Sequence, residues 1–260
     1  MILQEILAQK KREVEAALSK VPLAELKERL SAHAAERDLR AALAKPGRLH
    51  LIAELKRKSP SKGMLRERFD PVSLAQEMEG AGAAALSVLT DEVFFSGSLD
   101  YLRNAKQFTE IPVLRKDFIL DVYQIYEAAF HGADAVLLIV RILEEAQLKR
   151  CIAVAESLGL AALVEVHADS ELAVALRSGA KLIGINHRDL DTLQMDLGLS
   201  TRLMPKIPKG VLTVAESGIH TPQDVQRMRQ LGVNALLIGE ALMAAPSVSA
   251  KIRELFQLVW

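Results

Sequence analysis

The stretch GADAVLLIV, residues 132–140, joins a glycine to a run of residues typical of a buried strand. Glycine at such a place suits the left-handed conformation that ends many helices, and an uninterrupted apolar run suits a parallel strand covered on both faces. The same order recurs in GAAALSV (82–88), GLAALVEV (159–166), GAKLIGIN (179–186) and GVNALLIG (232–239). Each copy therefore predicts a passage from a helix into a strand.

Three further segments complete a predicted set of eight strands: LHLIAELK (49–56), IPVLRKDF (111–118) and VLTVAES (211–217). Amphipathic segments that fit crossover helices lie between them: 71–82, 98–108, 121–132, 144–159, 169–179 and 221–232. Several of these begin with Asp, Ser or Thr, which cap helix N-termini. Eight strand–helix units predict an α/β fold, the (β/α)8 TIM barrel. An open doubly wound sheet is the alternative, but the turn KSPSKG (58–63) lacks the glycine fingerprint expected after its first strand.

Length and composition favour one large folded domain. The chain has 260 residues, of which 50% are hydrophobic and 25% are charged, and its net formal charge is zero. We expect a single (β/α)8 barrel domain over residues 1–260, with residues 1–45 as an N-terminal helical extension. That extension reads as two helices with a break at Pro22. Balanced charge supplies no overall field to attract nucleic acid, so no nucleic-acid partner is expected.

Targeting signals and disulfides are not expected. The N-terminal residues build no apolar h-region, and the longest apolar strand-like run, AVLLIV at 135–140, is too short to span a bilayer. We therefore expect no membrane partner. The single cysteine, Cys151, shares a helical face with apolar residues and is expected to be buried, so an oxidising compartment is not required. These features predict a cytoplasmic protein, expected to be a monomer.

Polar residues interrupt the strands at their C-terminal ends. Strand side chains alternate between the two faces, so in LIAELKR (51–57) Glu54 and Lys56 share the face of Ile52. If Ala53 and Leu55 face the helices, Glu54 and Lys56 face the barrel axis at its mouth. The same argument places Lys116, Glu165, Asn186 and Glu216 there. Clustered charges shift one another's pKa and suit acid–base catalysis at the end where this fold places its chemistry.

The basic run KRKSPSKGMLRER (56–68) also fits a nucleic-acid or nuclear-localisation signal. Zero net charge, the lack of interleaved aromatic residues and the inward direction of Lys56 argue against that interpretation. The SPSKG portion is instead predicted to be a mobile loop over the mouth, in which Ser59 and Ser61 can donate hydrogen bonds.

Two glycine turns after the last strands predict a phosphate site. They are ESGI (216–219), which contains Gly218, and IGEALM (238–243), which contains Gly239. Glycine lets backbone amides approach an anion, and a helix N-terminus favours it, although two structural turns would give the same pattern. Glu240 would have to point its carboxylate away from the phosphate. The histidines are scattered, and His187 fits a loop residue as well as a ligand, so neither a metal nor a redox cofactor is expected.

Together these motifs closely resemble the indole-3-glycerol-phosphate synthase family. The resemblance runs in order from about residue 50 to 243, through IAELKRKSPSKG, LSVLTDEVFFSGS, VLRKDFILDVYQI, ADAVLLIV, LVEVH, IGINHRDL, VAESGI and LIGEALM. It implies a carbon–carbon lyase of tryptophan biosynthesis. The implied reaction converts 1-(2-carboxyphenylamino)-1-deoxyribulose 5-phosphate, a phosphorylated small molecule, into indole-3-glycerol phosphate, carbon dioxide and water.

The resemblance also implies roles for individual residues. Lys116 would protonate the keto oxygen, Glu165 would be its acid–base partner, and Lys56, coupled to Glu54, would either bind the substrate carboxylate or act as acid in dehydration. The carboxylate and hydroxyls of the substrate would be contacted by Asn186, Arg188 and Ser217, with support from Glu216. The phosphate of the substrate would be contacted by Gly218, Gly239, Glu240 and Ser59. The implied walls of the aryl pocket are Phe95, Phe118, Leu137 and Leu190, which from the residues alone would equally fit the core.

The sequence departs from the family pattern at two places, and two other functions remain as alternatives. His187 stands where the family often has a small residue, and AAPSV (244–248) lacks the usual acidic residue before proline. A ribose-phosphate isomerase of the tryptophan or histidine pathway would use Cys with Asp, or two Asp, at strand ends. A non-catalytic barrel scaffold would be expected to have lost one of the mouth residues.

Overall fold

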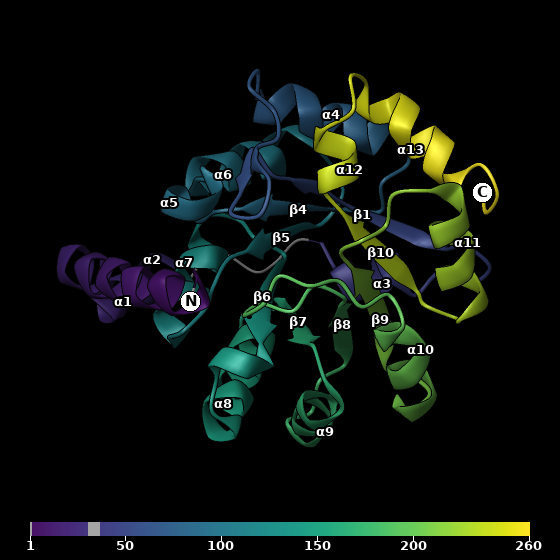
Figure 1. Ribbon diagram of the computed structural model, residues 1–260. Helices are drawn as coiled ribbons and strands as arrows, with labels where there is room; N and C mark the ends of the chain where they lie inside the picture. The colour runs from purple at the N-terminus through teal and green to yellow at the C-terminus, as the bar shows by residue number, and fades with distance from the viewer. Residues whose placement is uncertain (1, 31–36) are drawn as a thin grey trace.

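The computed structural model describes residues 2–30 and 37–260, and a closed barrel of parallel strands forms its centre. Around the barrel the order is β1 (His50–Leu55), β10 (Ala235–Ile238), β9 (Leu212–Glu216), β8 (Leu182–Asn186), β7 (Ala161–Val166), β6 (Ala135–Ile139), β5 (Val113–Lys116) and β4 (Ala85–Leu89). Each is one of the eight strands predicted from the sequence. The helices surround this ring (Figure 1). The predicted (β/α)8 fold is therefore confirmed.

The predicted crossover helices are also present. They are α4 (Pro71–Gly80), α6 (Leu99–Phe108), α7 (Val122–Phe130), α8 (Glu145–Ser157), α9 (Asp169–Arg177) and α11 (Pro222–Gln230). Side chains of Asp70, Ser98, Asp121 and Thr221 cap four of them by accepting backbone N–H bonds. The remaining short elements are α5 (Glu92–Phe95), η1 (Val140–Ile142), α10 (Leu199–Leu203), η2 (Met204–Lys206), α12 (Glu240–Met243) and α13 (Val248–Phe256). No helix among the described residues is long and apolar enough to cross a membrane.

Glycines end the helices where the repeated pattern predicts. The five repeat glycines, Gly82, Gly132, Gly159, Gly179 and Gly232, all have φ between 76° and 98°. This left-handed region is nearly free of cost only for glycine, and it turns the chain from the helix into the next strand.

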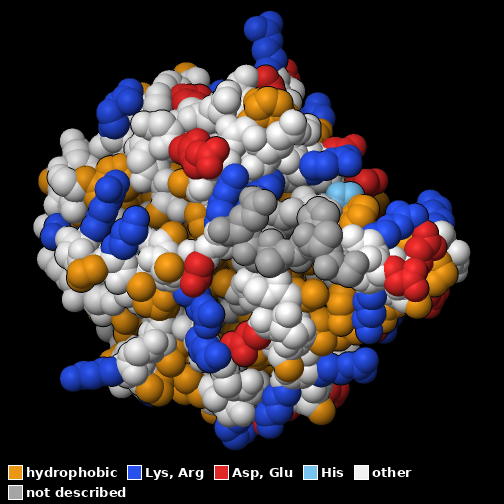
Figure 2. All heavy atoms as spheres, turned by 180° about the vertical axis from the view of Figure 1, so that it is seen from behind, with side chains coloured by type: hydrophobic (Ala, Val, Ile, Leu, Met, Phe, Trp, Pro, Cys, Tyr) orange, Lys and Arg blue, Asp and Glu red, His pale blue; other side chains and the backbone are white. Residues whose placement is uncertain are grey.

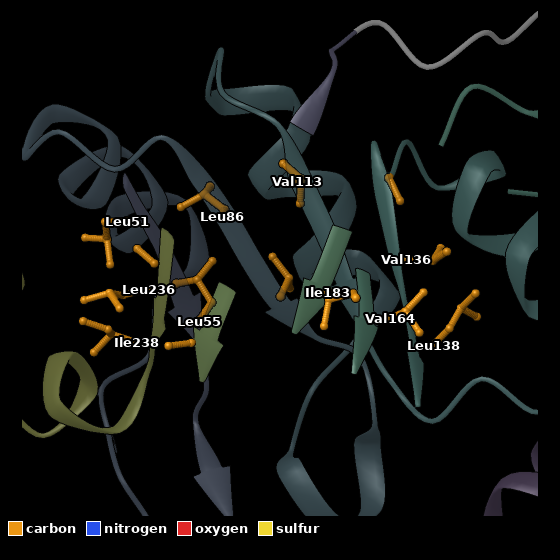
Figure 3. Packing of buried hydrophobic residues seen from close by; sticks show 14 of the residues in the cluster. Leu51, Leu55, Leu86, Val113, Val136, Leu138, Val164, Ile183, Leu236 and Ile238 are labelled. Carbon is orange, nitrogen blue, oxygen red and sulfur yellow. The ribbon is translucent and has the colours of Figure 1, made fainter. Parts of the chain in front are cut away.

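Strand alternation divides the apolar residues into two cores. Ile52, Leu114 and Leu137 belong to the cluster inside the barrel. Their strand neighbours belong to the cluster between the barrel and the helices, and Leu55, Val113 and Leu138 are among those shown in Figure 3. The register pairs Ile52 with Ala85 and Leu237, which keeps the interior positions of neighbouring strands at one level. The next inward residues, two positions further along each strand, therefore reach the mouth at a common level.

The N-terminal extension contains one helix more than predicted. α1 (Ile2–Lys20) and α2 (Leu23–Leu30) flank the break at Pro22, and α3 (Leu39–Leu43) follows before β1. Figure 1 shows α1 and α2 beside α7, where the hydroxyl of Tyr123 donates a hydrogen bond to the carbonyl oxygen of Ala17. Leu39 and Leu43 are fully buried and pack into the interior cluster. α3 thus fills the N-terminal end of the barrel.

The loop after β1 contains a short antiparallel pair that the sequence did not predict. β2 (Lys58–Ser59) pairs with β3 (Gly63–Met64), so that the pair encloses the SPSKG segment that was expected to be a mobile loop over the mouth. Figure 2, the face opposite to that of Figure 1, shows basic and acidic side chains interspersed, in keeping with the zero net charge of the chain.

Candidate active site

One cavity at the C-terminal ends of the strands brings together every site residue predicted from the sequence. Its lining includes Glu54, Lys56, Ser59, Phe95, Lys116, Phe118, Leu137, Glu165, Asn186, Arg188, Leu190, Glu216, Ser217, Gly218, Gly239 and Glu240. These residues come from all eight strands or from the segments that follow them. In the five strands to which strand alternation was applied, β1, β5, β7, β8 and β9, it identified the face that lines the cavity.

Lys116 lies at the centre of a group of carboxylates. Its Nζ atom is 3.2 Å from Glu165 Oε2 and 3.4 Å from Glu216 Oε2. Burial alone would lower the pKa of Lys116, but Glu165, Glu216 and Glu54 together raise it well above its usual range. Lys116 is therefore an ammonium ion at neutral pH, and this group lies between the side chains of Glu165 and Glu216.

The two central carboxylates differ in protonation. Burial raises the pKa of Glu165, but Lys116, His167 and Asn186 outweigh burial and hold that pKa well below its usual range. Burial also raises the pKa of Glu216, to about 8, with further increases from Glu165 and Glu54 and an opposing effect of Lys116. Among the described residues, Lys116 is the one cation within ion-pair distance of Glu216. The site therefore holds an anionic Glu165 beside a neutral Glu216.

Two glycines make room for the carboxylates. A Cβ atom on Gly184 would overlap Oε1 of Glu216, and one on Gly239 would overlap Oε2 of Glu54. Gly184 faces the barrel interior between Leu182 and Asn186 on β8, since its neighbours Ile183 and Ile185 pack outward. The close approach of these side chains thus requires glycine at both places.

A second ion pair lies on β1 and the residue after it. Lys56 Nζ is 2.6 Å from Glu54 Oε2, and the Glu54 side chain is almost completely buried while that of Lys56 is 18% exposed. Lys56 therefore presents a cation to the open part of the cavity, held in place by a buried partner.

Apolar side chains wall one side of the cavity. The rings of Phe95, on α5, and Phe118, after β5, have centroids 6.2 Å apart. Leu137 and Leu190 line the same cavity, as do Leu3 and Ile6 of α1. The extension therefore contributes directly to the mouth. Its contribution was not predicted residue by residue.

Across the barrel, the turns after β9 and β10 present backbone to the cavity. Ser217 and Gly218 follow β9 with φ of 68° and 75°, and a left-handed serine is an uncommon, strained conformation. His187 supports this turn, because its Nδ1 lies 2.9 Å from the carbonyl oxygen of Ser217 and its Nε2 lies 2.7 Å from the Ser200 hydroxyl. His187 is thus a buried residue of the loop after β8.

Arg188 and Glu240 close this side of the mouth. The Arg188 guanidinium donates to Glu240 Oε2 at 3.1 Å, and Lys62 Nζ lies 3.9 Å from Glu240 Oε1. The backbone N–H of Arg188 donates to Asn186 Oδ1. The carboxylate of Glu240 is therefore directed at two cations. Ser59 Oγ accepts the N–H of Lys62 at 3.2 Å.

Sequence reasoning missed two charged residues near the site. His167 directly follows β7, two positions beyond Glu165, with its Nε2 3.2 Å from Glu165 Oε1 and its Nδ1 3.1 Å from Glu171 Oε2. Lys10 of α1 is 4% exposed and contacts Asp91 and Asp117. The signals were present: alternation continues to His167, and Lys10 shares one helical face with Leu3 and Ile6.

Cys151 is buried on α8 with Leu148, Ile152 and Ala155, as its helical face predicted. Burial raises the pKa of its thiol to about 11. It lies outside the cavity lining. A thiolate nucleophile is therefore no part of this site.

Comparison with known proteins agrees with the geometry. A family model described as indole-3-glycerol phosphate synthase matches residues 3–255. Relatives named indole-3-glycerol phosphate synthase include those of Albidiferax ferrireducens, 50% identical over 258 residues, and Acetivibrio thermocellus, 46% identical over 256 residues, each alignment covering 98% of both chains. A solved 3-hexulose-6-phosphate synthase superposes with a TM-score of 0.65 at 15% identity, over 82% of this chain and 100% of that one, and so shares the barrel fold.

Proposed function

The chain belongs to the indole-3-glycerol phosphate synthase family, and from that membership we propose how its mouth residues carry out the family's reaction. The enzymes of this family are decarboxylating lyases of tryptophan biosynthesis. In the reaction, the aryl carbon that bears the carboxylate attacks the keto carbon of the deoxyribulose chain. Carbon dioxide then leaves, and water follows, so that indole-3-glycerol phosphate is formed.

Lys116 is the acid of the ring-closing step. The observation that carries this proposal is its position, with Nζ 3.2 Å from Glu165 and 3.4 Å from Glu216 inside the cavity. As the aryl carbon attacks, the carbonyl π electrons move to the keto oxygen, and the ammonium group gives that oxygen a proton. A positioned acid of this kind typically accelerates a reaction by about 10²–10⁴-fold.

Glu165 stabilises the cationic intermediate and later removes a proton. Its anionic charge lies beside the place where the ring becomes cationic after attack, and loss of carbon dioxide returns the bonding electrons to that ring. The hydroxyl left by ring closure then departs as water, with a proton from an acid. Glu165 takes the proton from the neighbouring carbon, which completes the indole double bond. Glu216, neutral beside it, supports Lys116 and Glu165 without adding a second negative charge.

Lys56 provides the second cation, either for the substrate carboxylate or for the departing hydroxyl. Its ion pair with buried Glu54 holds the ammonium group at the open part of the cavity. A carboxylate and a phosphate on one substrate require cations at separate places. Lys56, Lys116 and Arg188 supply three such cations within one lining.

The substrate lies across the mouth. Its aryl ring packs against Phe95, Phe118, Leu137 and Leu190, where exclusion of water favours loss of carbon dioxide. Its phosphate lies on backbone amides of the turns at Gly218, Gly239 and Glu240, with help from Ser59, on the far side of the barrel from β5. Asn186, Ser217 and Arg188 contact the hydroxyls and carboxylate between these ends.

We propose that residues 1–260 form one barrel domain, with residues 1–45 as its extension. Support comes from the interior cluster, which contains Leu3, Ile6, Leu39 and Leu43 of the extension together with the inward residues of the strands. We further propose that the protein acts as a cytoplasmic monomer.

A fluorescence assay tests this function. The purified chain, without added nucleotide, is mixed with 1-(2-carboxyphenylamino)-1-deoxyribulose 5-phosphate, and indole fluorescence is followed. We expect fluorescence to rise with time, because the indole ring forms only if closure, decarboxylation and dehydration are all completed. A folded chain that gives no gain above the blank would favour the scaffold instead. Release of an isomerised sugar phosphate without indole would favour the isomerase.

A further inference from the structure

Lys10 is a buried cation on α1. The other charged residues of this helix are exposed or half-buried. The Lys10 side chain is 4% exposed, and its Nζ lies 2.7 Å from Glu13 Oε2, 2.9 Å from Asp117 Oδ1 and 3.1 Å from Asp91 Oδ2. Burial alone would lower the pKa of Lys10, but Asp117, Asp91 and Glu13 raise it above its usual range. An ammonium group buried among carboxylates on other elements joins those elements.

Asp91, one of the two carboxylates outside α1, caps the helix α5, which carries Phe95. Asp91 is fully buried, and its Oδ1 accepts the backbone N–H groups of Phe94 and Phe95 at 2.8 and 3.3 Å. Among the described residues, Lys10 is the only cation within salt-bridge distance of Asp91. Asp91 caps the helix that carries Phe95, and the charge that balances Asp91 comes from Lys10 of α1.

The second carboxylate lies between a catalytic and an aryl-wall residue. Asp117 follows Lys116 and precedes Phe118, and its Oδ1 accepts the backbone N–H of Phe118 at 2.8 Å while contacting Lys10. Its Oδ2 accepts the hydroxyl of Thr90 at 2.6 Å and an N–H of Arg115 at 3.2 Å. Burial would raise the pKa of Asp117, but Arg115 and Lys10 lower it to about 2. Asp117 is thus an anion throughout the working pH range.

We propose that Lys10 is a positioning residue for the aryl wall, which it assembles by joining α1, α5 and the segment after β5. This inference rests on the proposed function, because it concerns the part of the cavity that receives the aryl ring. Leu3 and Ile6, on the same face of α1 as Lys10, line that cavity. One ammonium group thus fixes the two apolar side chains of α1 and the two rings, Phe95 and Phe118.

Removal of this charge has a local consequence. Without Lys10, two buried carboxylates would face each other, and Asp91 would have no cation. Repulsion between them would separate α5 from the segment that carries Phe118 and would release α1 from the mouth. The proposed phosphate turns follow β9, which lies directly across the barrel from β5, and β10, which β1 separates from β4. Among the described residues, neither turn forms an ion pair with Lys10, Asp91 or Asp117, so we expect phosphate binding to change less than binding of the ring.

The test compares Lys10→Met with Lys11→Met, which replaces the adjacent exposed lysine on α1. Steady-state kinetics with the carboxyphenylamino substrate are combined with two inhibitors: indole-3-glycerol phosphate, which contains the ring, and glycerol 3-phosphate, which lacks it. For Lys10→Met we expect KM and the inhibition constant of the ring-bearing inhibitor to rise about tenfold, with glycerol 3-phosphate within about twofold of wild type. Lys11→Met should match wild type throughout.

Two further variants guard against general destabilisation. Lys10→Arg keeps the charge, and Lys10→Met combined with Asp91→Asn removes the repulsion while Asn still caps α5. Both are expected to recover part of the lost affinity for the ring. A Lys10→Met enzyme that binds both inhibitors as wild type does, or loses affinity for both equally, would overturn the proposal. An inactive wild-type chain would instead count against the proposed function.

Discussion

The Nζ atom of Lys116 lies 3.2 Å from Oε2 of Glu165, although Lys116 ends β5, Glu165 is the next-to-last residue of β7, and the two are 49 positions apart in the sequence. Strand β6 separates them in the barrel, so both side chains must point inward and reach the same level. The contact holds the proposed acid as an ammonium ion and the proposed base as a carboxylate. It therefore sets the starting protonation state of the reaction.

Replacement of Lys116 by methionine removes the proton of the ring-closing step. We expect kcat to fall by at least about a hundredfold, the scale of a positioned general acid, while the variant remains folded. Stopped-flow or steady-state fluorescence of the indole product measures kcat. The matched control is Lys181→Met, which replaces an exposed lysine paired with Glu156 on the surface, and it should keep wild-type turnover. Unchanged turnover in Lys116→Met would remove Lys116 from this role.

The raised pKa of Glu216 predicts a pH-dependent stability. Because the folded pKa, about 8, exceeds the unfolded value of 4.5, the folded state binds more protons between these values. The stability that Glu216 contributes is complete below about pH 4.5 and is lost as pH rises towards 8, by at most about 1.4 kcal/mol per pH unit. Glu216→Gln should flatten this slope in urea unfolding measured from pH 5 to 8.

Glu165→Gln provides the contrasting control for that experiment. The pKa of Glu165 is lowered, so its charge contributes stability above its unfolded pKa and loses it as pH falls. Its replacement should therefore change the pH slope only on the acid side, below about pH 4.5. Identical slopes for wild type and Glu216→Gln between pH 5 and 8 would contradict a raised pKa at Glu216.

Gly184→Ala should disturb the site from inside the barrel. The added methyl group would meet Glu216 Oε1 and, at 3.3 Å, a methyl carbon of Leu163, so the Glu216 carboxylate has to move. We expect the free energy of unfolding to drop by about 1–3 kcal/mol, the usual cost of overpacking, together with a loss of kcat. Gly80→Ala is the control, because a Cβ there meets nothing within 4 Å at the end of α4. It should be neutral or slightly stabilising. Equal effects of the two changes would disprove the crowding at Gly184.

Much of the fold and site could be predicted because strand alternation is a strict rule. In β1 the inward Ile52 fixes Glu54 as inward too, and a closed barrel leaves no freedom to slip the register by one residue. The glycine repeats fixed the helix ends for the same reason, since each needs a positive φ. Predictions that depended on local backbone geometry were therefore confirmed.

The unpredicted features depend on contacts between distant segments. α3 has five residues, too few for a helical period to stand out, and its burial comes from filling the barrel end. The helical face that Lys10 shares with Leu3 and Ile6 indicated that it points inward, but its partners Asp91 and Asp117 lie far away in the sequence and could not be identified from it. The paired strands β2 and β3, two residues each, are likewise too short for a pattern.

The helix α3 fills the N-terminal end of the barrel, so the active-site cavity opens only at the C-terminal end of the strands in the part of the chain that the structure describes. Leu39 and Leu43 pack there against inward residues of the strands, and layers such as Ile52 and Leu114 occupy the axis above them. Carbon dioxide formed at the ring therefore has the same exit as the sugar phosphate, past α1 and the β2–β3 hairpin. Carbon dioxide and the indole product should leave through the same opening of the cavity. A substitution that narrows this opening beside α1 or the β2–β3 hairpin should therefore slow the release of both.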